Sequence, residues 1–107
     1  MKYHNKKTIV DGQIFDSKKE AQRWRELAVL ESCGVIDGLK RQTEYLLIPS
    51  QKGQTRTERP VKYVADFEYI DGNGEKIVED AKGLRTRDYV LKRKLMLFIH
   101  GIEVREV

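Results

Sequence analysis

Three residues in the second half of the chain, Asp66, Asp80 and Lys82, have the types and spacing of a site for phosphodiester chemistry. Alternate residues of a strand share one face, so Asp80 and Lys82 point the same way if they lie on a strand. Two carboxylates can bind Mg²⁺ and leave its other positions for water and a phosphate oxygen. A nearby lysine could orient the attacking water or stabilise charge in the transition state. The pattern therefore indicates metal-dependent hydrolysis.

The position of Asp66 relative to Asp80 depends on the turn between their two predicted strands. A two-residue turn would place Asp66 opposite Glu79, whereas a three-residue loop with Gly74 in the left-handed conformation would place it opposite Asp80. The Asn73-Gly74 pair favours the longer loop, which makes Glu79 an auxiliary or outward-facing residue. The alternative is a solvated hairpin with ordinary surface charges.

Hydrophobic periodicity, turn residues and helix caps predict the elements that position these residues. They are a hairpin with strands Thr8–Val10 and Gln13–Phe15, a helix Ser17–Cys33, strands Leu39–Ile48, Val61–Ile70 and Lys76–Lys82, a helix Arg87–His100 and a strand Ile102–Val107. Residues 50–59 are expected to form a loop. The second helix is long enough for a crossover, so the strands before and after it can lie parallel in a mixed sheet. The sequence thus predicts an α/β fold with helices covering the sheet.

Length and composition narrow the class of protein. A chain of 107 residues predicts a single domain, residues 1–107. The formal charge of +4 favours an anionic partner. One cysteine, Cys33, excludes an intramolecular disulfide and a zinc site built from several cysteines, and it fits a reducing cytoplasm. Because no stretch has the apolar length of a membrane span or the pattern of a signal peptide, we expect a cytoplasmic protein without membrane contact.

With these elements and motifs the chain resembles the PD-(D/E)XK nuclease superfamily, the fold of many restriction enzymes and Holliday-junction resolvases. More closely, it looks like small phage-encoded proteins grouped as a domain family of unknown function. The resemblance covers almost the whole chain, in Val10–Gly12, Phe15–Ala21, Ile36–Gln42, Tyr63–Phe67 and Val78–Gly83, with Thr86, Tyr89 and Lys92. Ala65 stands where the superfamily name implies proline. The resemblance implies a restriction-endonuclease-like αβββαβ core with a mixed central sheet flanked by helices, preceded by the N-terminal β-hairpin.

The resemblance also implies the roles of the site residues. Asp66 and Asp80 would be metal ligands for Mg²⁺, with Mn²⁺ as an alternative, and Lys82 would position the water. Glu20 matches a glutamate that superfamily members often add to the catalytic metal site, and it shares the sheet-facing stripe of its helix with Trp24. Ser17-x-x-Glu20 is equally a capping box, in which Glu20 bonds back to the helix start, and both roles can hold together.

Basic and polar residues outside this site are candidates for contacts with the DNA backbone. Arg85, Thr86 and Arg87 precede or open the second helix, where free N–H groups and guanidinium groups suit a phosphate. Lys92 follows on the same helix, either as a DNA contact or as part of a solvated basic face. Two further candidates, Lys52 and Arg56, lie in the predicted loop, which could equally be a mobile loop without a DNA role.

Other residues have a simpler reading. Gln42 is interpreted as a surface glutamine rather than a catalytic residue, although related nucleases sometimes place a polar residue near the metal at this strand. Trp24, Met96 and Phe98 are predicted to belong to the hydrophobic core.

These residues together predict a metal-dependent DNA endonuclease. The preferred substrate is a branched recombination or replication intermediate of phage DNA, such as a Holliday junction, because so small a protein has little surface for reading sequence. A homodimer is expected because cutting two strands needs two sites. If the protein is phage-encoded, its location is the bacterial host cytoplasm. The alternatives are a sequence-specific or nicking endonuclease with the same site, and a DNA-binding accessory domain that does not cut, which would have no need to hold like charges together.

Overall fold

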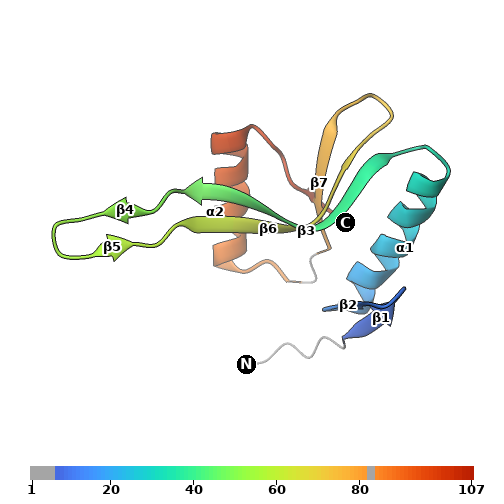
Figure 1. Cartoon of the computed structure of the whole chain (residues 1–107), viewed down its shortest axis with the longest axis horizontal. Coiled ribbons are helices and arrows are strands. Elements are labelled where there is room, and N and C mark those ends of the chain that lie inside the picture. Colours follow the sequence, from blue (N-terminus) through green and yellow to red (C-terminus); the bar gives the residue numbers. More distant parts are fainter. Residues whose placement is uncertain (1–6, 82–83) are drawn as a thin grey trace.

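A mixed four-stranded sheet forms the centre of the computed structural model, which describes residues 7–81 and 84–107 (Figure 1). Its strands are β3 (Asp37–Ile48), β6 (Val61–Ile70), β7 (Lys76–Asp80) and β8 (Arg105–Glu106), in the spatial order β3-β6-β7-β8. The first three are antiparallel to their neighbours, whereas β7 and β8 run parallel. The helical segment between β7 and β8 provides the crossover that a parallel pair requires. The predicted α/β fold with a mixed sheet is confirmed.

Two helical segments and an N-terminal hairpin complete the fold. The hairpin pairs β1 (Thr8–Val10) with β2 (Gln13–Phe15), and helix α1 (Lys18–Ser32) follows it. Asp11 and Gly12 connect the two strands with φ angles of 52° and 77°, as a tight hairpin turn requires. Helix α2 (Arg87–Leu95) continues directly into a π-helical turn, η1 (Met96–His100). The hairpin and both helical regions were predicted at these positions.

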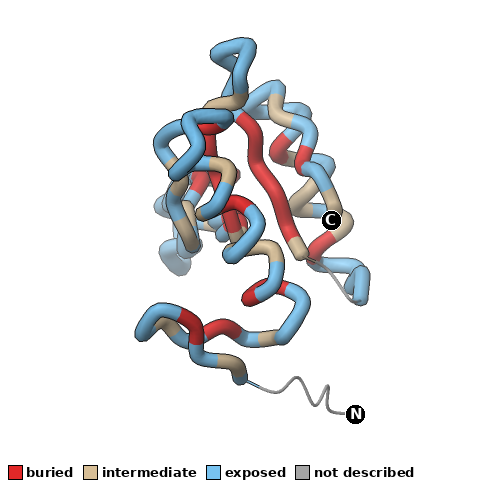
Figure 2. The backbone as a smooth tube through the Cα atoms, turned by 90° about the vertical axis from the view of Figure 1, so that its right-hand side faces the viewer, coloured by how far each residue is buried: buried red, intermediate tan, exposed pale blue. Residues whose placement is uncertain are grey.

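Strand β7 separates two hydrophobic clusters, because its successive side chains point to opposite faces. Ile77 packs in the cluster beneath α1, with Phe15, Ala21, Leu27, Phe67 and Tyr69. Val78 packs in the cluster beneath α2, with Tyr45, Tyr63, Ala65, Tyr89 and Met96. Figure 2 shows β7 as a continuous buried segment through the middle of the molecule. The strand that carries Asp80 is therefore fixed by packing on both faces.

The turn between β6 and β7 sets the register of the candidate site. The N–H of Asp71 donates to the carbonyl of Glu75 at 2.9 Å, so three residues form the loop, and Gly74 has a φ of +80°. Phe67 pairs with Glu79, and the same register places the preceding Asp66 beside Asp80. The predicted three-residue loop is the one observed.

Three predictions about the fold are corrected. Residues 50–59 are not a simple loop, because β4 (Gln51–Lys52) pairs with β5 (Thr57–Glu58). The last strand is limited to Arg105–Glu106. Phe98 is 86% exposed rather than part of the core, because the wider π-helical turn of η1 changes the angular step between residues and rotates its side chain toward solvent. None of the helices within the described ranges is long and apolar enough to cross a membrane.

Candidate functional site

Asp66 and Asp80 lie side by side where β6 and β7 meet at the end of β7. The N–H of Asp66 donates to Oδ1 of Asp80 at 3.0 Å, and the N–H of Ala81 donates to Oδ2 of Asp66 at 2.9 Å. Each carboxylate is thus held by the backbone of the opposite strand. Asp80 is fully buried, whereas Asp66 is partly exposed. The pair forms a fixed acidic centre with access from the side of Asp66.

Glu20 of α1 adds a third carboxylate near this pair. Its side chain is buried, and Oε2 accepts hydrogen bonds from the guanidinium of Arg41 and the amide of Gln42, both at 3.3 Å. Burial raises the pKa of Glu20 above its ordinary value, and the charge of Asp66 raises it further, while Arg41 opposes the shift. The structure therefore brings Glu20 into the electrostatic environment of Asp66.

The prediction that Ser17 caps the start of α1 is confirmed. The hydroxyl of Ser17 accepts a hydrogen bond from the N–H of Glu20 at 3.1 Å, which satisfies one free donor of the first turn. The carboxylate of Glu20, in contrast, points to β3, where Arg41 and Gln42 bind it. The predicted return bond from this carboxylate to the helix start is therefore replaced by its bonds to β3, and only the Ser17 half of the capping box is confirmed.

Gln42 contributes more to this arrangement than its sequence indicated. The flanking pairs Arg41–Phe67 and Thr43–Ala65 place it at the level of Asp66 in the β3–β6 ladder, and its φ of 52° is in the left-handed region. That conformation costs a residue with a side chain about 1–2 kcal/mol. The interaction with Glu20 accompanies this strained backbone. Glutamine is not a typical left-handed residue, so no sequence signal pointed to this conformation.

Arg41 is a second residue that the sequence did not single out. Its guanidinium binds Glu20, stacks over the ring of Phe15 at 3.9 Å and donates to the side chain of Gln13 at 3.0 Å. Arg41 therefore connects the candidate site to the N-terminal hairpin. Its partners are more than twenty residues away in the sequence. Only the folded chain reveals them.

The chemistry of the donors fits Mg²⁺, although the side chains do not form a closed cage. In residues 7–81 and 84–107, no three Asp, Glu, His or Cys side chains form a group that could hold a metal ion. Mg²⁺ is commonly held by one or two carboxylates and keeps waters or substrate phosphates as its other ligands. Asp66 and Asp80 supply these two carboxylates. Lys82, predicted to position the attacking water, lies outside the described residues.

Glu79 does not face outward as the sequence analysis allowed. It is 1% exposed on the α1 side of β7, where Arg23 donates to both carboxylate oxygens at 2.8 and 2.7 Å. The hydroxyl of Tyr69 also donates to it, and burial together with this carboxylate raises the pKa of Tyr69 to about 12. Glu79 therefore belongs to a buried structural ion pair and points away from Asp80.

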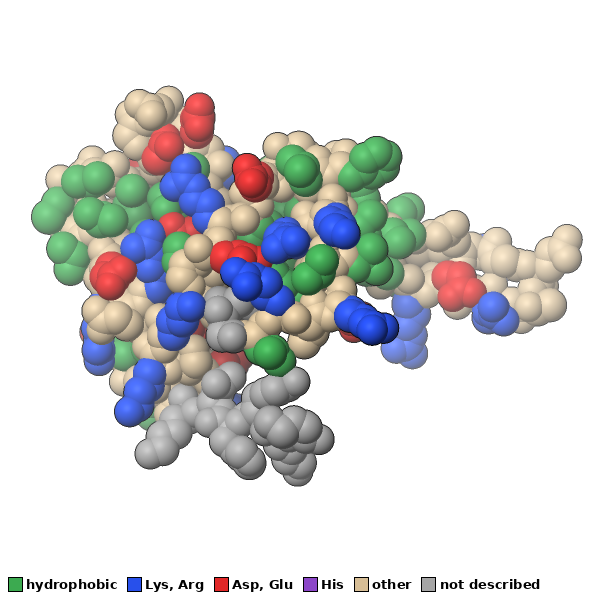
Figure 3. All heavy atoms as spheres, turned by 180° about the vertical axis from the view of Figure 1, so that it is seen from behind, with side chains coloured by type: hydrophobic (Ala, Val, Ile, Leu, Met, Phe, Trp, Pro, Cys, Tyr) green, Lys and Arg blue, Asp and Glu red, His purple; other side chains and the backbone are tan. Residues whose placement is uncertain are grey.

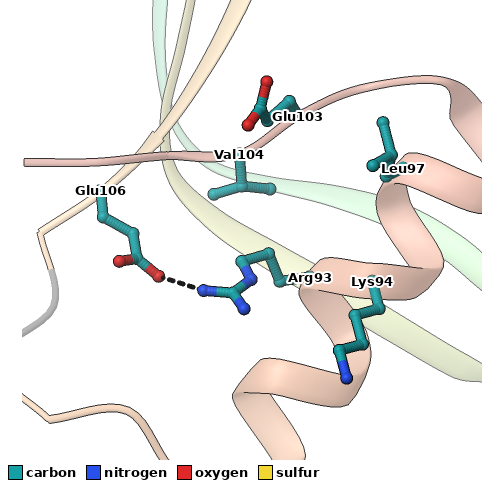
Figure 4. A pocket seen from close by; sticks show the side chains of 6 residues that line it. All are labelled: Arg93, Lys94, Leu97, Glu103, Val104 and Glu106. Carbon is teal, nitrogen blue, oxygen red and sulfur yellow. Dashed lines mark hydrogen bonds and ion pairs between the residues drawn. The ribbon is translucent and has the colours of Figure 1, made fainter.

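Glu106 of β8 is the centre of a second polar cluster beside α2. Its carboxylate accepts hydrogen bonds from Arg85 at 2.6 Å, the hydroxyl of Tyr89 at 2.8 Å and Arg93 at 2.9 Å. Hydrogen bonds from Arg85, Tyr89 and Arg93 lower the pKa of Glu106 to about 2. Figure 4 shows the Arg93–Glu106 pair at a pocket that Lys94 also lines. These bonds hold the side chains of Arg85 and Arg93 in place beside β8.

The predicted DNA contacts fall into two separate regions. Arg85, Thr86 and Arg87 line one shallow pocket at the start of α2, where the hydroxyl of Thr86 caps the helix. Lys92 is partly buried farther along the same helix. Lys52 and Arg56 are exposed on the β4–β5 hairpin, which projects beyond the Ile48 and Val61 end of the long β3–β6 pair (Figure 1). The structure brings the first three together and places the last two elsewhere.

Replacing Glu106 with glutamine should lower the free energy of unfolding at pH 7 by about 1 kcal/mol, because its donors lose a charged acceptor. Folding lowers the pKa of Glu106 from 4.5 to about 2, so its stabilising contribution is present above pH 4.5 and is lost as the pH falls toward 2. Urea unfolding of the wild type and of Glu106→Gln between pH 7 and pH 3 measures how their difference in free energy of unfolding changes with pH. Glu103→Gln, at an exposed carboxylate three residues earlier in the chain, is the control. A deficit that stays constant with pH would contradict the assignment.

Replacing Glu20 with glutamine should raise the stability of the metal-free protein at neutral pH. Folding raises the pKa of Glu20, so its contribution favours the fold below its ordinary value of 4.5 and is lost as the pH rises through the raised value. Glutamine removes the buried charge and keeps an acceptor for Arg41. Thermal unfolding in EDTA from pH 4 to pH 8 should show the advantage of the variant increasing with pH. A variant that becomes relatively less stable as the pH rises would show that the Arg41 ion pair dominates.

Comparison with known proteins identifies a family and no closer relative. A family model described as "Protein of unknown function (DUF1064)" matches residues 1–105. No curated protein and no solved structure matches the chain.

Proposed function

This chain belongs to the DUF1064 family, and we propose that it is a metal-dependent endonuclease that hydrolyses phosphodiester bonds in DNA. One observation carries the proposal: Asp66 and Asp80, on adjacent antiparallel strands, have carboxylates held together by reciprocal bonds to the backbone. Two acids kept this close disfavour each other's charge, and a bound cation relieves that cost. The order of elements, with a mixed sheet between two helices, also agrees with the restriction-endonuclease-like core that the resemblance implies.

Each residue of the proposed site has a distinct task. Asp66 and Asp80 would hold Mg²⁺, or Mn²⁺ in its place, and the ion would supply charge stabilisation at the phosphate and a more acidic bound water. Lys82 is assigned to orient the attacking water. Glu20, whose pKa is raised by burial and by the charge of Asp66, would exchange a proton at its carboxylate with water near Asp66.

DNA is the proposed substrate because basic side chains gather near the site on α2. Arg85 and Arg87 flank Thr86 at the start of that helix, a position that favours a phosphate, and Lys92 follows one to two turns later. A branched recombination or replication intermediate, cut by a homodimer, is the preferred form of the substrate, since so small a domain has limited surface for base contacts.

A DNA-binding domain that does not cut is the second candidate, and one observation favours it. Among the described residues no three-ligand metal group is formed, and Glu20 is already bound by Arg41 and Gln42. In such a domain the acids would only position the strands. The two candidates differ in whether product forms, so they can be separated directly.

The experiment is a cleavage panel of end-labelled four-way junction, flap, linear duplex and single-stranded DNA, incubated with Mg²⁺, Mn²⁺ or EDTA. The endonuclease proposal predicts metal-dependent product, greatest with the branched substrates. Preferential cutting of one linear duplex sequence would keep the chemistry and replace the branched substrate with a sequence-specific one. Binding without product in either metal would favour the second candidate.

A further inference from the structure

The β4–β5 hairpin forms an arm, residues 49–60, that stands clear of the rest of the protein (Figures 1 and 3). Every residue of the arm is exposed, so packing against the body does not explain its sequence. The N–H of Gly53 donates to the carbonyl of Arg56 at 2.8 Å, which leaves Gln54 and Thr55 as a two-residue tip. The arm is therefore an ordered two-stranded ribbon.

Two prolines separate the arm from the main sheet. The β3–β6 ladder reaches Ile48 and Val61, and pairing resumes with Gln51 and Glu58. The same register places Pro49 opposite Pro60, where neither residue has an N–H for the ladder. The break stops the sheet at this point and makes the arm a separate unit. Prolines at an exposed strand edge also hinder pairing with a strand of another chain.

The two faces of the arm differ in charge. Lys52 and Thr57 are paired directly across the strands and share one face, and Arg59 follows two residues after Thr57 on that face. No acidic residue of the arm shares this face. The opposite face carries Arg56 and Glu58, whose side chains form an ion pair at 2.7 Å. One face is therefore cationic and rich in hydrogen-bond donors, and the other is neutral.

We propose that the face formed by Lys52, Thr57 and Arg59 binds the phosphate backbone of double-stranded DNA. The inference rests on the DNA substrate of the proposed function and adds the place where the duplex is held. A two-stranded ribbon fits the major groove of B-form DNA, and lysine, arginine and threonine side chains are common phosphate contacts. In this proposal Arg59 is the DNA contact, in place of Arg56, which the sequence analysis had predicted. Its position at the far end of the β3–β6 pair suits a DNA arm extending away from the cleavage site.

The test is duplex binding in EDTA, where no metal-dependent cleavage interferes, measured by fluorescence anisotropy over a range of salt concentrations. The Lys52→Gln/Arg59→Gln variant should reduce the slope of log affinity against log salt by about 2, roughly 0.9 for each lost phosphate contact. Its affinity should fall about tenfold or more at moderate salt. Arg56→Gln removes the same charge as either single substitution from the other face of the arm, so it is the matched control and should leave the slope nearly unchanged.

Other outcomes would overturn the inference. Equal effects of Arg56→Gln and Arg59→Gln would show only a general charge effect, and an unchanged slope in the double variant would exclude the arm from binding. A change in oligomeric state on sedimentation, without a change in DNA affinity, would assign the arm to a second copy of the chain. The arm proposal and the endonuclease proposal can fail separately. If the wild type binds DNA through the arm but does not cut it, only the nuclease is excluded. If the wild type cuts DNA and the Lys52→Gln/Arg59→Gln variant binds it unchanged, only the arm is excluded.

Discussion

The Asp80→Asn variant is expected to lose DNA cleavage by roughly a thousandfold while it remains folded. Metal-assisted charge stabilisation contributes several kcal/mol to such reactions, and each 1.36 kcal/mol is a factor of ten in rate. Asparagine keeps an acceptor for the N–H of Asp66, which donates to Asp80 at 3.0 Å in the wild type. It also removes a fully buried charge, so stability should stay equal or rise in the absence of metal. Single-turnover cleavage in Mg²⁺, with thermal unfolding in EDTA, measures both effects.

Metal binding gives a second readout that does not depend on knowing the right DNA. Mg²⁺ or Mn²⁺ should raise the unfolding temperature of the wild type and not that of Asp80→Asn, because a ligand that binds only the folded state stabilises it. Asp11→Asn is the matched control, since this exposed position has a φ of 52° that asparagine tolerates. An Asp80→Asn protein that keeps wild-type cleavage and metal response would remove Asp80 from the site.

The Arg23→Met variant is expected to lose about 3–5 kcal/mol of stability. Arg23 makes two hydrogen bonds to Glu79, which is 1% exposed, so the substitution leaves a buried carboxylate without its counter-charge. The hydroxyl of Tyr69 remains as one partner and cannot neutralise the charge. Because Glu79 precedes Asp80 on β7, the same loss should loosen the strand that carries the candidate site. Urea unfolding monitored by circular dichroism measures the change in free energy.

Arg25→Met on the same helix removes the same charge from an exposed position and should change stability by no more than about 0.5 kcal/mol. The double variant Arg23→Met/Glu79→Met should recover much of the loss, since replacing both members of a buried pair with apolar groups is often neutral. If Arg23→Met is no more destabilising than Arg25→Met, the buried ion pair does not hold β7 against α1.

The features that could be predicted from sequence are those set by local chemistry. Asp11-Gly12 specifies a tight turn, Ser17 caps α1, and Asn73-Gly74 sets a three-residue loop that places Asp66 beside Asp80. Side chains alternate between the two faces of a strand. Once the register is known, it therefore also determines that Asp66 lies beside Asp80 rather than Glu79. The family match covers nearly the same length as the predicted resemblance and adds no activity.

The features that could not be predicted depend on distant partners or on an irregular backbone. Glu20 meets Arg41 and Gln42 only after α1 folds against β3, and the left-handed Gln42 has no sequence signature. Glu79 alternates with Asp80 and so had to face the opposite side, but its burial depends on Arg23 of α1. Phe98 was misassigned because a regular helical period does not apply across a π-helical turn.

Metal-dependent cleavage of a labelled four-way junction by the wild-type protein tests the proposed nuclease most directly. The junction is incubated in EDTA and then in increasing Mg²⁺, with Mn²⁺ in a parallel series and Asp66→Asn beside the wild type. We expect no product in EDTA, product that increases with either metal, and none from the variant. Wild-type protein that binds the junction yet yields no product in Mg²⁺ or Mn²⁺ would contradict the proposal and leave a DNA-binding domain.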